Sequence, residues 1–364
     1  MDLQSSSKHL SNCESNMKPN IKNIKYINKK LAGLTVVELI IDLVLSTLVV
    51  SAVLGLYVNY KTSYNYQSDT MYIYQNARTA YNYIHDDMQV AGFYGCNSNA
   101  ADIEYKLTPS FDYLLNNIVT GFEATGTGIN STFSLASPSS GWTPILQGQM
   151  ATRAPNAGSD VITVRFSDTN SSAILSADTT GASMSATGIQ NNVSVGDILL
   201  ISDCQRTVLF QVATVGTNTI TPTLSVGSLN AGAEIYRINV HSYFVKTVNS
   251  VPGLYRVRNN IEELVVPYVE NMQILFGQDT NSDGITDRYN SANNVGSNPI
   301  TNMTLSFLMR SINKHTQSQL QTSFKMFNAP IAMQTTTTVT TNSDKYLRKS
   351  FDFNLNLPNV GGVL

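Results

Sequence analysis

The sequence predicts an α+β protein, in which a long N-terminal helix with a transmembrane first half packs on a mainly antiparallel β-sheet body. Two observations lead to this prediction. An apolar run from Leu34 to Val58 continues into a stripe of apolar residues at helical spacing that ends near Ala91. The later residues form short apolar or alternating segments separated by Gly, Asn and Pro, as strands do. The predicted parts are a head (1–33), a helix (34–92) and a β-rich body (93–364).

The apolar run is long enough to cross a membrane. It has 25 residues, no Pro and a single Gly, and as a helix it would be about 37 Å long. Lysines precede it, so the positive-inside rule keeps the N-terminus cytoplasmic and sends the body outward. A secretory signal peptide is disfavoured because the run is too long and no small-x-small cleavage site follows. A plain single-span anchor remains an alternative.

Composition favours an extracellular β-rich protein over a cytosolic enzyme. Only 13 % of the 364 residues are charged, and Asn, Ser, Thr and Tyr are abundant. Six Lys against two acidic residues give residues 1–33 a charge of about +4, which leaves about −6 on the rest. An acidic body argues against nonspecific nucleic-acid binding, so no nucleic-acid partner is expected.

Two carboxylates, Glu38 and Asp42, lie inside the apolar run. A carboxylate in lipid costs a few kcal/mol and usually has a cationic partner at the same depth. Cleavage between Gly33 and Leu34 would create such a partner, because the new α-amino group of one copy would lie near Glu38 of its neighbour. Asp42 shares the face of Glu38, one helical turn later. We therefore expect Glu38 and Asp42 to pair with neighbouring subunits in the membrane.

These residues resemble the class III leader of type IV pilins. The stretch KKLAGLTVVELI has the basic leader, Gly33, a hydrophobic first mature residue (Leu34) and Glu38 as the fifth mature residue. The resemblance implies a pilin-like fold, cleavage after Gly33 by a prepilin peptidase and methylation of the Leu34 amine. Asp42 departs from the pattern, which usually has a small or apolar residue there. It indicates a specialised subunit, or equally an acid that reaches back to the lipid head groups.

The helix is expected to continue beyond the membrane on an apolar stripe. The stripe consists of Met71, Tyr74, Ala77, Tyr81, Ile84, Met88 and Ala91, spaced three or four apart. Gly92 follows as a natural C-cap. The stripe is interpreted as core, packing one helix face on the body.

A second resemblance, to the PilW family of minor pilins, rests on QNARTAYNYIHDDMQVAGFYGC (75–96) and GDILLISDCQRTVLFQV (196–212). The chain has three Cys, and removing the head with Cys13 leaves one pair, which suits an oxidising compartment. The residues alone also allow two buried free thiols. The resemblance implies a disulfide between Cys96 and Cys204 that ties the helix end to the sheet.

The body is expected to contain several strands. Residues 97–157 are interpreted as loops and short strands, and Thr335–Thr341 as a Thr-rich loop or edge. The remaining candidate strands are Asp160–Phe166, Asp197–Ser202, Thr207–Val215, Glu234–Val248 with a break, Gly253–Arg258, Val269–Phe276, Met303–Arg310 and Phe351–Leu357.

The segment DTNSDGITD (279–287) has the oxygen spacing of a calcium loop, with Gly284 at the sixth position. The candidate Ca²⁺ ligands are Asp279, Asn281, Asp283, the carbonyl of Ile285, and Asp287. The twelfth position is Asn290 instead of Glu, and a strand precedes the loop, so it is not an EF-hand. The alternative is a polar hairpin, since Asn, Asp and Gly also favour turns.

No catalytic constellation is expected, because the sequence lacks GxSxG, HExxH and Walker motifs and has only four His. The chain is therefore interpreted as a structural subunit and not an enzyme. The PilW resemblance implies a minor pilin that primes type IV pilus assembly, near the tip. Its implied partners are other minor and major pilins, the prepilin peptidase, the inner-membrane assembly platform and a tip adhesin. The prepilin would be a single-pass inner-membrane protein with a periplasmic body, moved to the cell surface on assembly.

Two other functions fit the same features. A type II secretion pseudopilin shares the leader and can be large and calcium-binding. A membrane-anchored, calcium-stabilised adhesin or binding module would keep its head uncleaved.

Overall fold

The computed structural model describes residues 35–96, 102–108, 110–168, 170, 172–281, 283–295, 300–315, 321–327 and 337–358. Residues 1–61 and 62–364 form two separate compact units. The head, with Cys13, and the cleavage-site residues Gly33 and Leu34 lie outside the described residues. Helix α1 (Val36–Val90) begins and ends close to the predicted bounds. Gly92 adopts φ +74° and donates its N–H to Arg165 O at 3.0 Å, which confirms the predicted glycine cap.

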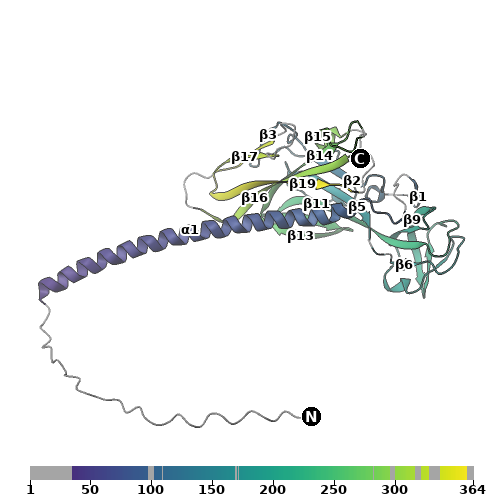
Figure 1. The fold of residues 1–364 in the computed structure, drawn as a ribbon, viewed down its shortest axis with the longest axis horizontal. Helices are drawn as coiled ribbons and strands as arrows, with labels where there is room; N and C mark the ends of the chain where they lie inside the picture. The colour runs from purple at the N-terminus through teal and green to yellow at the C-terminus, as the bar shows by residue number, and fades with distance from the viewer. Residues whose placement is uncertain are drawn as a thin grey trace, which may run out of the picture. The chain divides into compact units, whose positions relative to one another are not determined.

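The body is mainly antiparallel, as the sequence predicts, and Figure 1 shows strands β16 and β19 running beside α1. Twelve strands form the largest sheet of the described residues: β1 (Ile103–Lys106), β2 (Val119–Ala124), β4 (Trp142–Thr143), β5 (Val161–Ser167), β6 (Ala173–Ile174), β7 (Met184–Ser185), β8 (Ile198–Ser202), β9 (Thr207–Gly216), β10 (Thr219–Pro222), β11 (Glu234–Val248), β12 (Val251–Arg258) and β13 (Ile261–Pro267). The main path is β4-β2-β5-β11-β8-β9-β10-β7. β12 pairs with β11 and β13, β6 pairs with β11, and β1 lies parallel to β9.

Two smaller sheets complete the body. One has the order β15-β14-β16-β19, and the other has the order β17-β18-β3. Their strands are β14 (Val269–Gln278), β15 (Arg288–Asn290), β16 (Ile300–Lys314) and β19 (Tyr346–Asn356), and β3 (Thr132–Ser134), β17 (Ser323–Met326) and β18 (Thr337–Thr340). Short 3-10 turns are η2 (Phe111–Tyr113), η3 (Gly148–Met150), η4 (Ile189–Asn191) and η5 (Ala292–Asn294).

The predicted strands are found, together with five short strands that were not expected, β6, β7, β10, β15 and β17. Three further differences concern longer segments. β11 is continuous, so the expected break is wrong. Its first half pairs with β6 and β8 and its second half with β5 and β12, which together span the whole strand. β13 was not expected because Glu262 and Glu263 interrupt its apolar pattern. In the structure Lys246 pairs with Glu262 at 2.6 Å and Arg256 with Glu263 at 2.6 Å, and so both charges are tolerated on this strand. Residues Thr337–Thr340 form the middle strand of the small sheet.

The helix stripe is partly wrong at its start. Met71 is 73 % exposed and Tyr74 46 % exposed, whereas Ile73 is buried. The buried face consists of Ile73, Ala77, Ala80, Ile84, Met88 and Ala91 and joins the main core with the strands. Ile73 keeps the i, i+4 spacing to Ala77, so the helical period predicted the correct face from Ala77 onward but not its first residues.

A second core belongs to a lobe built from residues 173–235. It contains sixteen buried apolar residues, among them Leu199, Phe210 and Ile235. Strands β6 and β9 of this lobe, together with β1, gather near the C-terminal end of α1 (Figure 1).

Two carboxyls, Asp160 and Glu123, are buried beside each other, and Asp160 joins the large sheet to the four-stranded sheet. Asp160 Oδ1 accepts the N–H of Ala124 in β2 at 2.8 Å, and Oδ2 accepts that of Ile274 in β14 at 2.9 Å. Burial raises the pKa of Asp160 to about 7. Burial, together with the nearby charge of Asp160, raises the pKa of Glu123 to about 9. Both carboxyls therefore bind protons more tightly in the folded state than in the unfolded state.

Glu123→Gln is expected to raise the free energy of unfolding at pH 8 by about 1–3 kcal/mol. Because the pKa of Glu123 is higher in the folded chain than in the unfolded chain, the protonated Glu123 contributes stability at pH values below the unfolded pKa near 4.5. That stability is lost as the pH rises toward 9. The amide stays neutral throughout, so the gain should shrink when unfolding is measured at pH 5. Asp86→Asn, at a largely exposed carboxylate, is the matched control and should show no such trend. An equal change at both pH values would contradict the burial argument.

Candidate functional site

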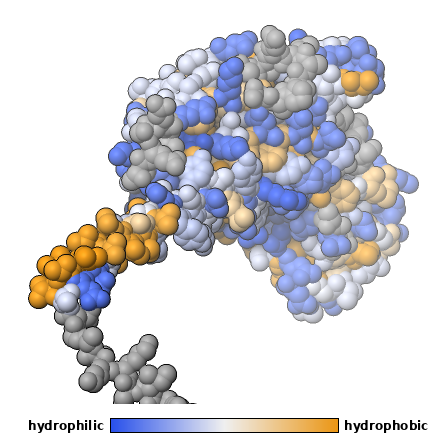
Figure 2. Space-filling model, turned by 60° about the vertical axis from the view of Figure 1, so that its left-hand side comes forward, coloured by the Kyte–Doolittle hydropathy of each residue, from blue (hydrophilic) through white to orange (hydrophobic). Residues whose placement is uncertain are grey.

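The first part of α1 is an apolar surface that nothing in the described chain covers. Every residue from 35 to 61 is exposed, and an 18-residue window in this helix has a mean hydropathy of 2.5. Figure 2 shows apolar residues gathered along this stretch. By length and composition it is the one helix of the described residues that could cross a membrane. Large exposed apolar surfaces mark sites of contact with membranes or with other proteins.

Glu38 and Asp42 lie at the start of this surface. Thr35 precedes the helix, and its hydroxyl accepts the Glu38 N–H at 3.3 Å, an N-cap geometry. The i, i+4 spacing places Asp42 on the same helix face as Glu38. No ion pair joins either carboxylate to another residue in the described ranges.

Two buried acid–histidine pairs fasten the second part of α1 to the sheets. Asp87 accepts hydrogen bonds from His241 Nδ1 at 2.6 Å and from the Tyr243 hydroxyl at 2.5 Å. Five turns earlier, Asp69 contacts His315 Nε2 at 2.9 Å. The two acids and the two histidines are at most 12 % exposed. These pairs could not be predicted from the sequence, because each joins residues more than 150 positions apart.

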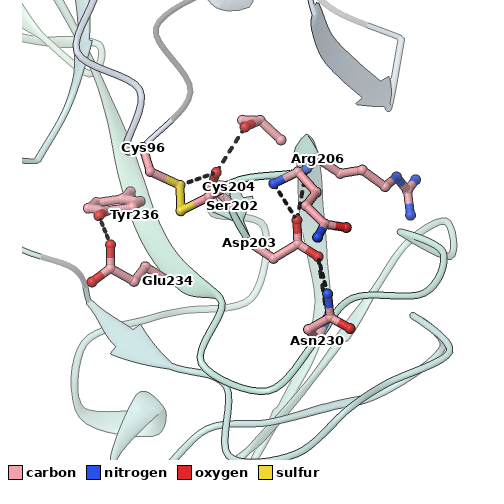
Figure 3. Close-up of a disulfide and its surroundings, with 10 residues drawn as sticks. Cys96, Ser202, Asp203, Cys204, Arg206, Asn230, Glu234 and Tyr236 are labelled. Atoms are coloured by element: carbon pink, nitrogen blue, oxygen red, sulfur yellow. Dashed lines mark hydrogen bonds between the residues drawn. A yellow bond between two sulfur atoms is a disulfide. The ribbon is translucent and has the colours of Figure 1, made fainter.

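The predicted disulfide is present. Cys96 and Cys204 are bonded, with an S–S distance of 2.17 Å and Cα atoms 5.2 Å apart (Figure 3). Cys204 lies in the turn between β8 and β9, where it adopts φ +64°. The bond ties the segment that follows the Gly92 cap to the lobe.

The turn that carries Cys204 is itself held by polar contacts. Asp203 Oδ1 accepts the N–H groups of Gln205 at 3.1 Å and Arg206 at 2.8 Å, and Oδ2 contacts Asn230 at 3.3 Å (Figure 3). Arg206 in turn binds Glu104 with two bonds of 2.9 Å, which lowers the pKa of that carboxyl. Asp203 and Arg206 thus fix the position of Cys204 relative to β1.

The acidic loop between β14 and β15 is folded on its own polar groups. Gly284 adopts φ +83° and donates its N–H to Asp279 Oδ2 at 2.7 Å. Asn281 Nδ2 lies between Asp283 Oδ2 at 3.1 Å and Asp287 Oδ1 at 3.4 Å. Hydrogen bonds from Thr280 lower the pKa of Asp287.

This loop brings together most of the predicted ligands around one amide group. Asp279, Asn281, Asp283 and Asp287 are linked by hydrogen bonds, and the Ile285 N–H donates to Asp283 Oδ1 at 2.8 Å. Ser282, within the loop, is not described. Across the described ranges, no group of three or more His, Cys, Asp or Glu side chains has the arrangement of a metal site. Calcium binding therefore stays a prediction.

Comparison with known proteins gives one match. Residues 242–359 match the model of the PilW family, described as type IV pilus-assembly protein W. None of the curated proteins matches the chain. The matched range covers the second half of β11, the β12–β13 hairpin and the four-stranded sheet, whereas α1, the disulfide and the whole lobe lie before it. These earlier parts carry the features that pointed to the same family. Residues 242–359, about a third of the chain, are therefore similar to the PilW family of type IV pilus-assembly proteins.

Proposed function

We propose that this protein is a minor pilin, a structural subunit and not an enzyme, that primes type IV pilus assembly near the tip. The observation that carries the proposal is the exposed apolar start of α1 with Glu38 in phase with the Gly33–Leu34 cleavage site, on a chain whose body has a PilW-family region. The prepilin waits in the inner membrane with its body in the periplasm, and assembly carries it to the cell surface. Its partners are other minor and major pilins, the prepilin peptidase and the inner-membrane assembly platform. A tip adhesin is a further candidate partner.

The surroundings of Glu38 support the proposed pairing with a neighbouring subunit. It lies in a helix segment whose side chains are apolar and exposed, so its charge is costly in lipid without a cation. After cleavage, the methylated amine of Leu34 would lie at the start of the neighbouring chain's helix, four residues before that chain's own Glu38. Asp42 adds a second acid on the same face, which raises the need for partners that bring positive charge.

Glu38→Leu is expected to reduce incorporation into pili by at least about tenfold, because the pairing of a charge in lipid is worth a few kcal/mol. The measurement is the amount of this protein in sheared pili, together with pilus number, in a strain whose own copy is deleted. Ile40→Leu, in the same apolar run, is the matched control and should assemble normally. Intact-mass spectrometry should find a chain that begins at methylated Leu34.

These experiments distinguish a minor pilin from a membrane-anchored binding module and from a secretion pseudopilin. Normal assembly by the Glu38→Leu variant would refute the pairing. An uncleaved head would favour a plain membrane-anchored binding module, and a deletion strain that keeps its pili but loses protein secretion would favour a secretion pseudopilin.

We further propose that the Asp279–Asp287 loop binds Ca²⁺. Asn281 Nδ2 occupies a place between two carboxylates, Asp283 and Asp287, and a donor held by two carboxylates marks a position that suits a cation. When bound, calcium would neutralise these acids and rigidify the β14–β15 turn.

Calorimetric titration with CaCl₂ is expected to show one site and a rise in the unfolding temperature. Asp283→Asn together with Asp287→Asn should remove both effects, because the site loses two charged oxygens. Asp203→Asn, at an acidic turn of different geometry, is the control and should leave the calcium response intact. The absence of both heat and thermal shift in the unmodified chain would show that the loop is only a polar hairpin.

A further inference from the structure

A pocket of about 340 Å³ lies in the body, and none of its lining residues belongs to α1, the disulfide or the acidic loop. Leu135, Pro138 and Pro252 form apolar walls, while Ser250, Glu270 and Arg310 supply polar groups. Asn156, Ala157 and Thr247 complete the lining, so five of the nine lining residues are polar. Concave sites in which apolar walls meet convergent polar groups are where small ligands bind. The polar groups indicate what it would bind.

Arg310 is the cation of this pocket, and its guanidinium is only loosely held. Its Nη1 is 3.5 Å from Glu270 Oε1 and its Nη2 is 3.3 Å from Ser250 O. Both distances exceed the 2.7–2.9 Å of a strong charge-assisted bond. Arg348 takes the same carboxylate with bonds of 2.5 and 2.9 Å, and takes Asp344 with bonds of 2.6 and 2.7 Å. Arg348 therefore neutralises the nearby acids, and Arg310 is left incompletely paired.

The charged side chains around Arg310 also sum to a positive charge. Three cations, Arg310, Lys314 and Arg348, lie 4.1, 5.2 and 5.8 Å from the centre of the Tyr346 ring. Two carboxylates, Glu270 and Asp344, are paired with them. The cluster therefore has one positive charge in excess. The Arg310 side chain is only 11 % exposed, and stacking on Tyr346 holds its planar head in place.

We propose that this pocket binds a carboxylate carried on a short apolar stem. The carboxylate would complete the coordination of Arg310, for which a planar fork is the preferred partner, and the stem would lie against the Leu135, Pro138 and Pro252 walls. A small organic acid and the C-terminal carboxylate of a peptide share this chemistry. The proposal does not depend on pilus assembly, and its test is made on the purified chain.

The test compares an acid with its neutral counterpart. Ligand-observed NMR on the full chain in detergent should show that 4-methylpentanoate binds at least about tenfold more tightly than 4-methylpentanamide. Arg310→Gln should abolish this preference. Arg153→Gln removes a guanidinium that lies 3.4 Å from Glu262 outside the pocket, and it should leave the preference unchanged. Equal binding of acid and amide, or an unchanged preference in a folded Arg310→Gln chain, would overturn the proposal.

If Arg310→Gln does not fold, a second variant tests whether the acid binds in this pocket. Ala157 lines the pocket and carries no polar side chain, so Ala157→Phe should fill the space and weaken the acid at least about tenfold while Arg310 stays in place. Unaltered binding by that variant would also overturn the proposal. Tighter binding of acetyl-Ala-Ala-Leu than of the free acid, lost on C-terminal amidation, would identify a peptide source. The reverse order would identify a small acid.

Discussion

Replacing both Cys96 and Cys204 by serine is expected to lower the free energy of unfolding of the body by about 4 kcal/mol. The bond closes a loop with a sequence separation of 108, and the entropy that such a loop removes from the unfolded chain is worth about 4–5 kcal/mol at 25 °C. The folded state keeps its other ties at this place, because the contacts of Asp203 with Arg206 and of Arg206 with Glu104 do not involve sulfur. The effect should thus act mainly on the unfolded state.

Denaturant unfolding in detergent, followed by the fluorescence of the single Trp142, is the measurement. Trp142 is a suitable reporter because its Nε1 donates to Ser159 O at 2.9 Å within the body. Reduction of the unmodified chain should reproduce the loss, and reduction of the double variant should change nothing. Cys13→Ser is the matched control. If the free energy of unfolding of the double variant lies within about 1 kcal/mol of that of the unmodified chain, the disulfide does not restrict the unfolded chain as the loop-entropy argument requires.

Arg165→Met is expected to cost about 3–5 kcal/mol, the range for leaving buried polar groups without their charged partner. Arg165 lies in β5 and is fully buried. Its guanidinium donates to the carbonyl oxygens of Asp112 at 2.8 Å, Asn117 at 2.6 Å and Phe111 at 3.0 Å, and to the Thr120 hydroxyl at 2.9 Å. Burial lowers the pKa of Arg165 to about 10, so the guanidinium still carries its charge at neutral pH.

The stability lost in Arg165→Met would be lost mainly in residues 111–120. These four acceptors all belong to residues 111–120, which lead from η2 into β2, and no other single side chain of the described residues joins them all. Methionine fills much of the same volume but donates no hydrogen bond, so three carbonyl groups lose a donor. Arg165→Lys should cost less, because it keeps the charge but not the planar fork.

The measurement is the same Trp142 unfolding experiment, with hydrogen exchange to locate the change at residues 111–120. Arg153→Met is the control, since Arg153 is 22 % exposed and pairs with Glu262 at 3.4 Å, a surface pair worth about 1 kcal/mol or less. A loss for Arg165→Met no larger than that of Arg153→Met would mean that the buried cation is not what organises this segment.

Much of the fold could be predicted from the sequence because its signals are local. The apolar run, the helical period and Gly92 define α1 within a few residues, and alternation with turn residues located most strands. The early part of the stripe failed at Met71 and Tyr74, because the helix begins to contact the sheets through Ile73 and the polar side chains of Asp69 and Asn76. Periodicity counts only apolar residues, and so it cannot include buried polar contacts.

Less of the candidate site could be predicted, because its contacts join distant segments. Glu38, Asp42, the cysteine pair and the acidic loop could be named from spacing and resemblance, and the structure brings the cysteines together and links the loop residues. The histidine–aspartate pairs, Arg165 and the Arg310 pocket had no signal in the chain. Each depends on which strands pair and in which register, for example Arg310 opposite Arg348 in β16 and β19.

The sequence by itself therefore determined the long helix with an apolar start that could cross a membrane, the position of its two acids and the division between helix and β-rich body. It could do so because membrane length, helical period and charge in an apolar run are properties of consecutive residues. Only the tertiary structure decided which charged side chains are buried, which acids pair with which bases and where the body has a pocket. Those properties arise when strands far apart in the sequence pair in a single register, which turns otherwise ordinary Arg, His and Asp residues into neighbours in a low-dielectric interior.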